Sequence, residues 1–373
     1  MMMRCLLLTL LFLPLFASSI DETPAVEAPP ETAPEADDPE KLSELIDTLN
    51  QASLQEAFRL LTDDYINGEE LDSLEVNRSA LQGMLSRLDF GAMLLTAKSI
   101  QDRNSRFVFH AEKINRSTAY LRFGRYNQAG LAEMDEALKE FVAEKEITDL
   151  IIDLRSPQAT AEFAIASEIL SRFRPPNELL FKIRRPGADR PTLFVSKSSG
   201  PSWSRNLILL VDRETGNVGE IIAAVLKRKS NPLIIGETTP GLTVEYRDVP
   251  IGEDRIMRYA IAEVVLDDDS SIFRKGIAPD IETPTPVKSK HAIFDATQKD
   301  QKLTEFLYQK QRPRMNEAAL VAGIDPEIDY YILRTNGKET PWDKPPLQDR
   351  ALQQAVDLLN ANAFLESGRK TRR

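Results

Sequence analysis

The sequence predicts an α/β protein with a central, mostly parallel sheet. Three short, unbroken apolar runs support this prediction, at positions 150–152, 207–211 and 233–236. Segments with the 3.6-residue period of an amphipathic helix separate these runs. Strands that are apolar on both faces are typical of parallel sheets, because helices cover both sides of such sheets. The chain has 373 residues, of which 42% are hydrophobic, and this is enough to build a core.

The first predicted elements are helical. Between positions 42 and 99, apolar residues recur at helical spacing, first as Leu54, Phe58, Leu61 and Tyr65 and then as Val76, Ala80, Met84 and Leu88. We therefore expect a small N-terminal helical subdomain over residues 42–99.

The predicted core, residues 107–288, alternates strands and helices. The expected strands cover Thr118–Phe123, positions 150–152, 207–211 and 233–236, and Met257–Val265. Helices are expected between them, over positions 131–141, Glu162–Phe173 and Gly219–Lys227. A hairpin is expected around the turn Pro186-Gly187. Residues 289–373 are predicted to form a C-terminal helical extension whose last helix covers Arg350–Phe364.

The N-terminal 41 residues differ in composition from the core. Residues 1–19 combine Arg4, an apolar run and the small residues Ala17 and Ser19, which is the pattern of a cleaved signal peptide. An uncleaved anchor is the alternative, but the run is shorter than the roughly 20 residues of a spanning helix. Residues 20–41 hold five prolines and eight carboxylates, so we expect a disordered acidic spacer. These features predict a secreted or periplasmic protein with no membrane span after signal cleavage.

The composition disfavours several classes of function. The net charge is −11, from 47 Lys and Arg against 58 Asp and Glu, which disfavours nucleic-acid binding. Two histidines, His110 and His291, and one cysteine, Cys5, are too few for a His/Cys zinc site. Positions 236–243 have the glycine spacing of a phosphate loop, but Leu242 stands where the phosphate-binding lysine is needed. We therefore predict no metal, no cofactor and no nucleic acid, with a peptide or protein segment as the partner and the oligomeric state unknown.

Five blocks of sequence occur in a characteristic order. They are Leu54 to Leu88, Ala119 to Arg155, VDRETGNVGEI at Val211–Ile221, IIGETTPG at Ile234–Gly241 and KGIAPDI at Lys275–Ile281. In order and spacing they resemble the C-terminal processing (tail-specific) serine peptidase family. The resemblance implies a crotonase/ClpP-like α/β protease core, secreted or periplasmic, that cuts proteins near their C-termini with a Ser/Lys dyad. Such a lysine acts as a base only when burial lowers its pKa, and the chemistry needs no histidine.

The resemblance places both members of the dyad on residues that cannot perform its chemistry. The nucleophile position is Asn217, and an amide cannot become an attacking alkoxide. The base position is Leu242, and an alkyl group cannot accept a proton. No competent catalytic residue is therefore predicted. The residues expected around the cleft, as a peptide-binding set, are Thr215, Gly216, Asn217, Glu220, Thr239 and Leu242.

Two further departures from the family agree with this. Asp153-Leu154-Arg155 is followed by Ser156-Pro157-Gln158-Ala159-Thr160, which lacks the two glycines of the family's oxyanion turn. Only the 17 residues 90–106 stand where the family usually inserts a PDZ domain that grips the substrate. Seventeen residues cannot form an independent domain. The nucleophile, the base, the oxyanion turn and the PDZ domain are thus missing together.

The leading hypothesis is a secreted, non-catalytic homologue of these peptidases that binds peptide or protein segments, or acts as a scaffold or regulator. One alternative is an active serine-type endopeptidase that uses unassigned residues, for example Thr215 with Lys227 or Lys229. Another is binding of an apolar small molecule in the cleft, because Leu242 replaces a charge.

Overall fold

The computed structural model describes residues 44–67, 70–96, 98–99, 107–157, 162–198, 200–307, 317–338 and 347–370. The predicted signal peptide and acidic spacer, residues 1–41, lie outside the described residues. The chain divides into two units, Met1–Ser79 and Ala80–Arg373. Among the described residues, no helix has the length and apolar character needed to cross a lipid bilayer.

The predicted helices of the N-terminal region are α2 (Gln51–Asp63) and α3 (Ser73–Leu88). Asn50 caps α2, because its side chain accepts a hydrogen bond from the Ser53 amide at 2.9 Å. Neither helix has a buried residue.

The end of this region differs from the helical prediction over residues 42–99. Ala92–Leu95 forms strand β1, which pairs antiparallel with β10 (Ile256–Val265). The pairing runs from Ala92 opposite Tyr259 to Leu95 opposite Ile256. All four residues of β1 gain strand partners at the edge of a sheet, and Ala92 and Leu95 become buried there. A helical period cannot reveal such a pairing. The stretch 90–106 therefore contributes a strand of the core; residues 97 and 100–106 lie outside the described part.

The predicted mostly parallel sheet is present, and its six strands follow the order β11-β8-β7-β4-β3-β2. All neighbours are parallel except β2 and β3. The strands are β2 (His110–Lys113), β3 (Thr118–Arg122), β4 (Asp149–Asp153), β7 (Asn206–Val211), β8 (Leu233–Gly236) and β11 (Ile281–Glu282).

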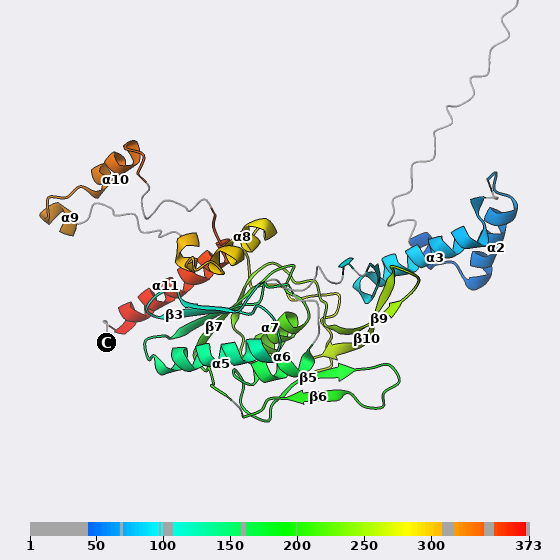
Figure 1. Cartoon of the computed structure of the whole chain (residues 1–373), viewed down its shortest axis with the longest axis horizontal. Helices are drawn as coiled ribbons and strands as arrows, with labels where there is room; N and C mark the ends of the chain where they lie inside the picture. Colours follow the sequence, from blue (N-terminus) through cyan, green and yellow to red (C-terminus); the bar gives the residue numbers. More distant parts are fainter. Residues whose placement is uncertain are drawn as a thin grey trace, which may run out of the picture. The chain divides into compact units, whose positions relative to one another are not determined.

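Helices cover both faces of this sheet (Figure 1). One face carries α5 (Gln128–Ala143), α6 (Phe163–Leu170) and α7 (Val218–Lys229), and the other carries α8 (Val287–Thr297) and α11 (Arg350–Lys370). In β4, Leu150 and Ile152 pack into the apolar cluster on the first face, whereas Ile151 packs into the cluster on the second. Because successive side chains point to opposite faces, a strand covered on both sides needs an unbroken apolar run.

A second sheet is antiparallel. It has the order β1-β10-β5-β6, with β9 (Val244–Pro250) paired to β10. Strands β5 (Leu179–Arg184) and β6 (Thr192–Val195) form the predicted hairpin, and Gly187 turns it with a φ of +76°. Strand β9 begins two residues after Leu242, so this predicted site residue lies next to the antiparallel sheet in the chain.

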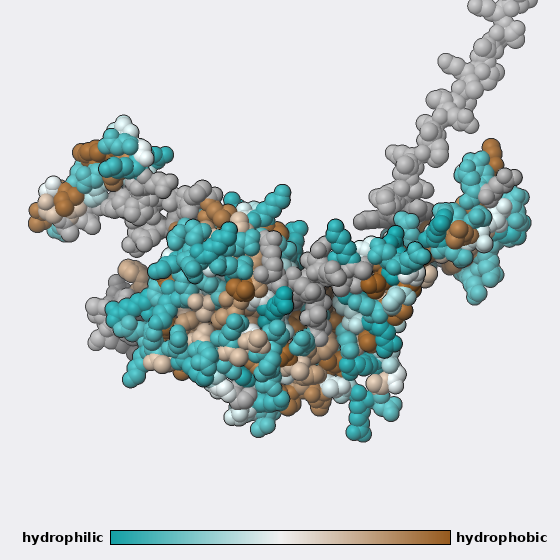
Figure 2. Space-filling model, in the orientation of Figure 1, coloured by the Kyte–Doolittle hydropathy of each residue, from teal (hydrophilic) through white to brown (hydrophobic). Residues whose placement is uncertain are grey.

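The described part of the predicted C-terminal extension contains helices joined by turns and irregular segments. Helix α8 begins at Val287, two residues before the predicted boundary, and a 3₁₀ helix at Leu303–Phe306 follows it. Helices α9 (Glu317–Val321) and α10 (Pro326–Thr335) present exposed apolar side chains (Figure 2). The exposed side chains are Leu320, Val321, Ile328, Tyr331 and Ile332.

Candidate functional site

The candidate site lies at the carboxyl ends of the parallel strands, where open α/β sheets hold their ligands. The chain leaves β7 through residues 212–217 and enters α7, and it leaves β8 through residues 237–243 and enters β9. These two loops and the first turn of α7 carry all the residues that the sequence predicts for the cleft.

The structure brings Asn217 and Leu242 together. A Cβ atom added to Gly216 would lie 3.5 Å from Cδ1 of Leu242, so the leucine packs directly against the turn that carries Asn217. Asn217 is 5% exposed and adopts a φ of 45° at the start of α7. Its side-chain amide donates a hydrogen bond to the Val244 carbonyl at 3.1 Å. Asn217 hydrogen-bonds to the backbone, and Leu242 packs in the adjacent space. Neither side chain can act as an acid or a base in proton transfer.

Glu220 holds this arrangement in place. Its carboxylate accepts hydrogen bonds from the Asn217 amide at 3.2 Å, the Leu242 amide at 2.6 Å, the Thr239 hydroxyl at 2.5 Å and the Gly241 amide. The side chain is fully buried, and this burial raises the pKa of Glu220 although the four hydrogen bonds oppose the shift. The loop before β9 is therefore tied to the first turn of α7 by one carboxylate.

The other two predicted residues shape the turn before α7. The Thr215 side chain is fully buried, and its hydroxyl accepts a hydrogen bond from the Asp212 amide at 2.9 Å. The Asp212 carboxylate in turn accepts from the amides of Glu214 and Thr215. Gly216 lies in this turn beside Leu242, and a Cβ atom there would make an ordinary van der Waals contact with the leucine. Thr215 thus closes a turn, as hydroxyls at such positions commonly do.

The segment after β4 lies next to this turn. A Cβ atom on Gly219 would lie 3.5 Å from the Leu154 carbonyl. Ser156 is buried, and its hydroxyl has no hydrogen-bond partner among the described residues. Residues 158–160 of the predicted glycine-free turn lie outside the described part.

A cavity of about 490 Å³ adjoins the site. Val244, whose carbonyl accepts from Asn217, forms one wall. Ala260, Ala262 and Phe273 contribute to its apolar lining, and the charged residues Arg184, Arg185 and Glu263 also line it. The volume lies within the range of small-ligand pockets.

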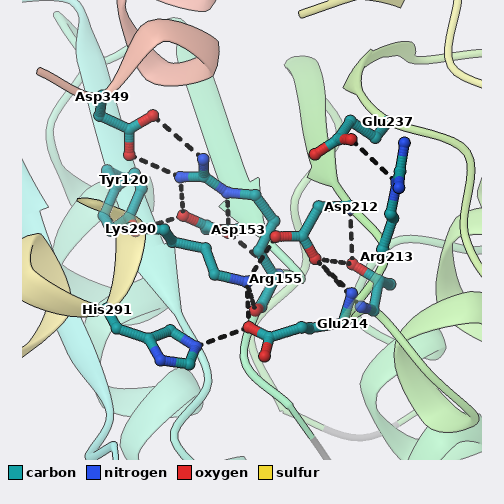
Figure 3. Close-up of polar contacts among 11 residues, drawn as sticks. Tyr120, Asp153, Arg155, Asp212, Arg213, Glu214, Glu237, Lys290, His291 and Asp349 are labelled. Atoms are coloured by element: carbon teal, nitrogen blue, oxygen red, sulfur yellow. Dashed lines mark hydrogen bonds and ion pairs between the residues drawn. The ribbon is translucent and has the colours of Figure 1, made fainter. Parts of the chain in front are cut away.

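A buried ionic cluster that the sequence reasoning missed lies beside these turns (Figure 3). At its centre, Arg155 is 1% exposed and binds two carboxylates. Asp153 accepts from it at 2.9 and 2.6 Å, and Asp349 accepts at 3.0 and 2.7 Å. The Tyr120 hydroxyl also donates to Asp153, at 2.7 Å. Burial works against ionisation of Asp153, but Arg155 and Tyr120 hold the pKa of that carboxyl below its ordinary value.

Lys290 of α8 is the second cation of the cluster. It is fully buried, and its ammonium donates to the Arg155 carbonyl at 2.8 Å and to the Asp212 carboxylate. It also lies 2.6 Å from a carboxylate oxygen of Glu214, which the ring of His291 contacts at 2.6 Å. Figure 3 shows the lysine reaching between the two acidic side chains. All three ammonium protons therefore have an acceptor.

Two sequence signals point to this cluster once it is known. Asp212 directly follows an unbroken apolar strand, at the edge where ligand sites form. Lys290 occupies an apolar-face position of its helix, with Ile293, Phe294 and Thr297 at helical spacing. Neither signal identifies the partner, because Asp212 and Lys290 are 78 positions apart.

Glu214 provides a pH prediction. Burial would raise the pKa of its carboxyl, but Lys290 and then His291 hold it below the ordinary value of 4.5. A carboxyl with a lowered folded-state pKa stabilises the protein above pH 4.5 and loses that contribution as the pH falls through the folded value. Glu214→Gln should therefore lower the free energy of unfolding at neutral pH, and its deficit should shrink as the pH falls below 4.5. Urea unfolding across an acidic pH series measures this.

Glu136→Gln is the matched control, because Glu136 is exposed on α5 and pairs with Lys139 three residues on. The free energy of unfolding of Glu136→Gln should change with pH in the same way as that of the wild type. A deficit in Glu214→Gln that stays constant with pH would contradict the assigned ionic contact.

No group of three or more His, Cys, Asp or Glu side chains that could hold a metal occurs among the described residues. His291 contacts Glu214, and His110 lies 3.1 Å from Glu112.

Comparisons with known proteins agree with the four sequence blocks between Ala119 and Ile281. The model of Peptidase family S41 matches residues 117–283. The carboxy-terminal processing protease CtpB of Bacillus subtilis is 24% identical over 233 residues, covering 59% of this chain and 48% of its own. The carboxy-terminal-processing protease of Bartonella bacilliformis is 23% identical over 225 residues, covering 59% and 51%. Among solved structures, a putative peptidase from Parabacteroides merdae superposes with a TM-score of 0.48 and 15% identity, over 66% of this chain and 85% of that one. The chain spans about half the length of the curated relatives it matches.

Proposed function

Residues 117–283 form a peptidase family S41 domain homologous to carboxy-terminal processing proteases, and from this premise we propose that the protein is a non-catalytic homologue that binds peptide or protein segments. The proposed binding site is the cleft beside Asn217 and Leu242 together with the adjoining cavity behind Val244. The bound segment is extended and is recognised through its backbone and apolar side chains.

One observation carries the proposal. The two positions that the family resemblance assigns to nucleophile and base are adjacent in space, yet they hold an amide and an alkyl side chain. Glu220 still ties the two loops together through four hydrogen bonds. A cleft that keeps its framework without its reacting groups is suited to binding.

Thr215 is poorly placed to restore catalysis. Its side chain is fully buried and its hydroxyl is engaged with Asp212. Lys227 and Lys229 pair with Asp280 and Asp267 at the far end of α7, so neither contacts the threonine. A hydroxyl becomes a nucleophile only with a base in hydrogen-bond reach.

The finer features of the proposal follow the family. The core is of the crotonase/ClpP-like type, with the helices before position 92 as a small subdomain and those after 288 as an extension. We expect the signal-like residues 1–19 to direct the protein to the periplasm or to secretion, with residues 20–41 as a spacer. Support comes from the composition of the N-terminus and from the homology of residues 117–283.

A second candidate, binding of an apolar small molecule, is favoured by the cavity of about 490 Å³ next to Val244. Native mass spectrometry of the purified protein distinguishes the two candidates, because a small ligand would add a defined mass.

The binding test uses an unfolded probe, fluorescein-labelled reduced and carboxymethylated lactalbumin. We expect the full-length protein to bind it at micromolar concentrations, by fluorescence anisotropy, and to leave it uncleaved. Ala260→Leu places a larger side chain at the apolar cavity and should weaken binding by about tenfold or more. Ala361→Leu, on the exposed part of α11, is the matched control and should bind as the wild type does.

Absence of binding at micromolar concentrations would refute the binding proposal. Cleavage of the probe that disappears in Thr215→Ala would instead establish the active-peptidase alternative.

A further inference from the structure

The helices after residue 283 contact the candidate site through buried ions. They lie beyond the region that matches the peptidase family, which ends at position 283. Asp349 immediately precedes α11 and binds Arg155, and Lys290 of α8 binds the Arg155 carbonyl and Asp212. The turns after β4 and β7 are thus attached to the C-terminal helices by charged groups.

Lys290 contacts both turns at once. The Arg155 carbonyl belongs to the residue just before Ser156, where the β4 turn begins. Asp212 and Glu214 belong to the turn that leads to Asn217. The other oxygen of the Asp212 carboxylate accepts from the amides of Glu214 and Thr215, so the group held by Lys290 also shapes that turn.

Because Lys290 is buried, its contacts limit how far the two turns can move relative to α8. The ammonium is fully buried, so water cannot replace a lost acceptor without reorganisation. Three acceptors around one ammonium leave no spare donor. A change in the separation of the two turns must therefore break a contact of Lys290, and so must a shift of α8 relative to them.

We infer that Lys290 is a positioning residue that fixes the separation of the two turns bordering the cleft, so that helix α8 sets the geometry for ligand binding. The inference rests on the proposed function for its binding readout. Its structural readout, the local opening of the two turns, does not depend on any ligand.

The experiment tests whether Lys290 positions the two turns or only neutralises the buried carboxylate of Asp212. Lys290→Met/Asp212→Asn removes both charges, and the oxygen of the new side-chain amide can still accept from the amides of Glu214 and Thr215. The Lys290–Asp212 pair is replaced as a whole and Glu214 keeps its contact with His291, so part of the stability lost in Lys290→Met should return. The bond to the Arg155 carbonyl stays absent. Amide hydrogen exchange in residues 154–157 and 212–217 should be about tenfold faster than in the wild type, with α5 unchanged. Binding of the carboxymethylated lactalbumin probe should weaken about tenfold.

Wild-type exchange and wild-type binding in the double variant would overturn the inference. If the wild-type protein does not bind the probe, the proposed function fails, while the exchange rates still decide the role of Lys290. Lys290→Arg keeps the charge should the double variant not fold. Its planar guanidinium cannot reproduce the three-way contact, so faster exchange in both turns is expected there too. Unchanged exchange in Lys290→Arg would then overturn the inference. Lys139→Met, at an exposed lysine of α5, is the matched control.

Discussion

Arg155→Met is expected to lower the free energy of unfolding by about 3–5 kcal/mol, because it leaves two buried carboxylates without their cation. Arg155 is 1% exposed, and both Asp153 and Asp349 have fully buried side chains. Methionine is long enough to fill much of the space but offers no donor. Urea unfolding at neutral pH measures the effect.

The control is Arg116→Met. Arg116 also pairs with a carboxylate, Glu146, but the two side chains are 82% and 59% exposed. An exposed pair contributes little, because water and salt screen its charges, so this variant should unfold almost as the wild type does. Similar losses in the free energy of unfolding of the two variants would contradict the view that burial makes the Arg155 ion pairs important for stability.

Glu220→Gln is the second large effect. The carboxylate accepts two donors on each oxygen, from Asn217 and Leu242 on one and from Thr239 and Gly241 on the other. A glutamine amide group must point its own N–H donors at one of these pairs. We expect a loss of about 3 kcal/mol in the free energy of unfolding, because buried donors are left without acceptors.

The same substitution should also weaken binding of the carboxymethylated lactalbumin probe, because the loop that carries Leu242 loses part of its hydrogen bonding to α7. Glu140→Gln, on the exposed side of α5, is the matched control and should change stability by less than about 0.5 kcal/mol. A Glu220→Gln protein with wild-type stability and binding would show that the four hydrogen bonds do not hold the cleft.

Much of the fold could be predicted from local sequence. The apolar run at 150–152 predicted a strand covered on both faces, and Leu150 and Ile151 do pack into clusters on opposite sides of the sheet. The hairpin at Pro186-Gly187 was also correct. The end of the helical prediction at residue 99 was wrong, because Ala92–Leu95 is a strand that exists only through its pairing with β10.

The candidate site was predictable in part. The order of the sequence blocks located Asn217, Glu220, Thr239 and Leu242, and the structure brings these four residues into one arrangement. That none of them is catalytic, and that the protein is secreted, remain predictions for experiment.

The sequence by itself determined the alternation of strands and helices, the family resemblance and the identity of the residues at the two dyad positions, because these depend on periodicity and on single side chains. Only the tertiary structure decided which charges meet. Arg155 and Asp349 are 194 positions apart, and Lys290 and Asp212 are 78 apart. Such pairs form because the carboxyl ends of β4 and β7 lie against α8 and against the start of α11. Burial then makes each unpaired charge costly, so the partners become part of the fold.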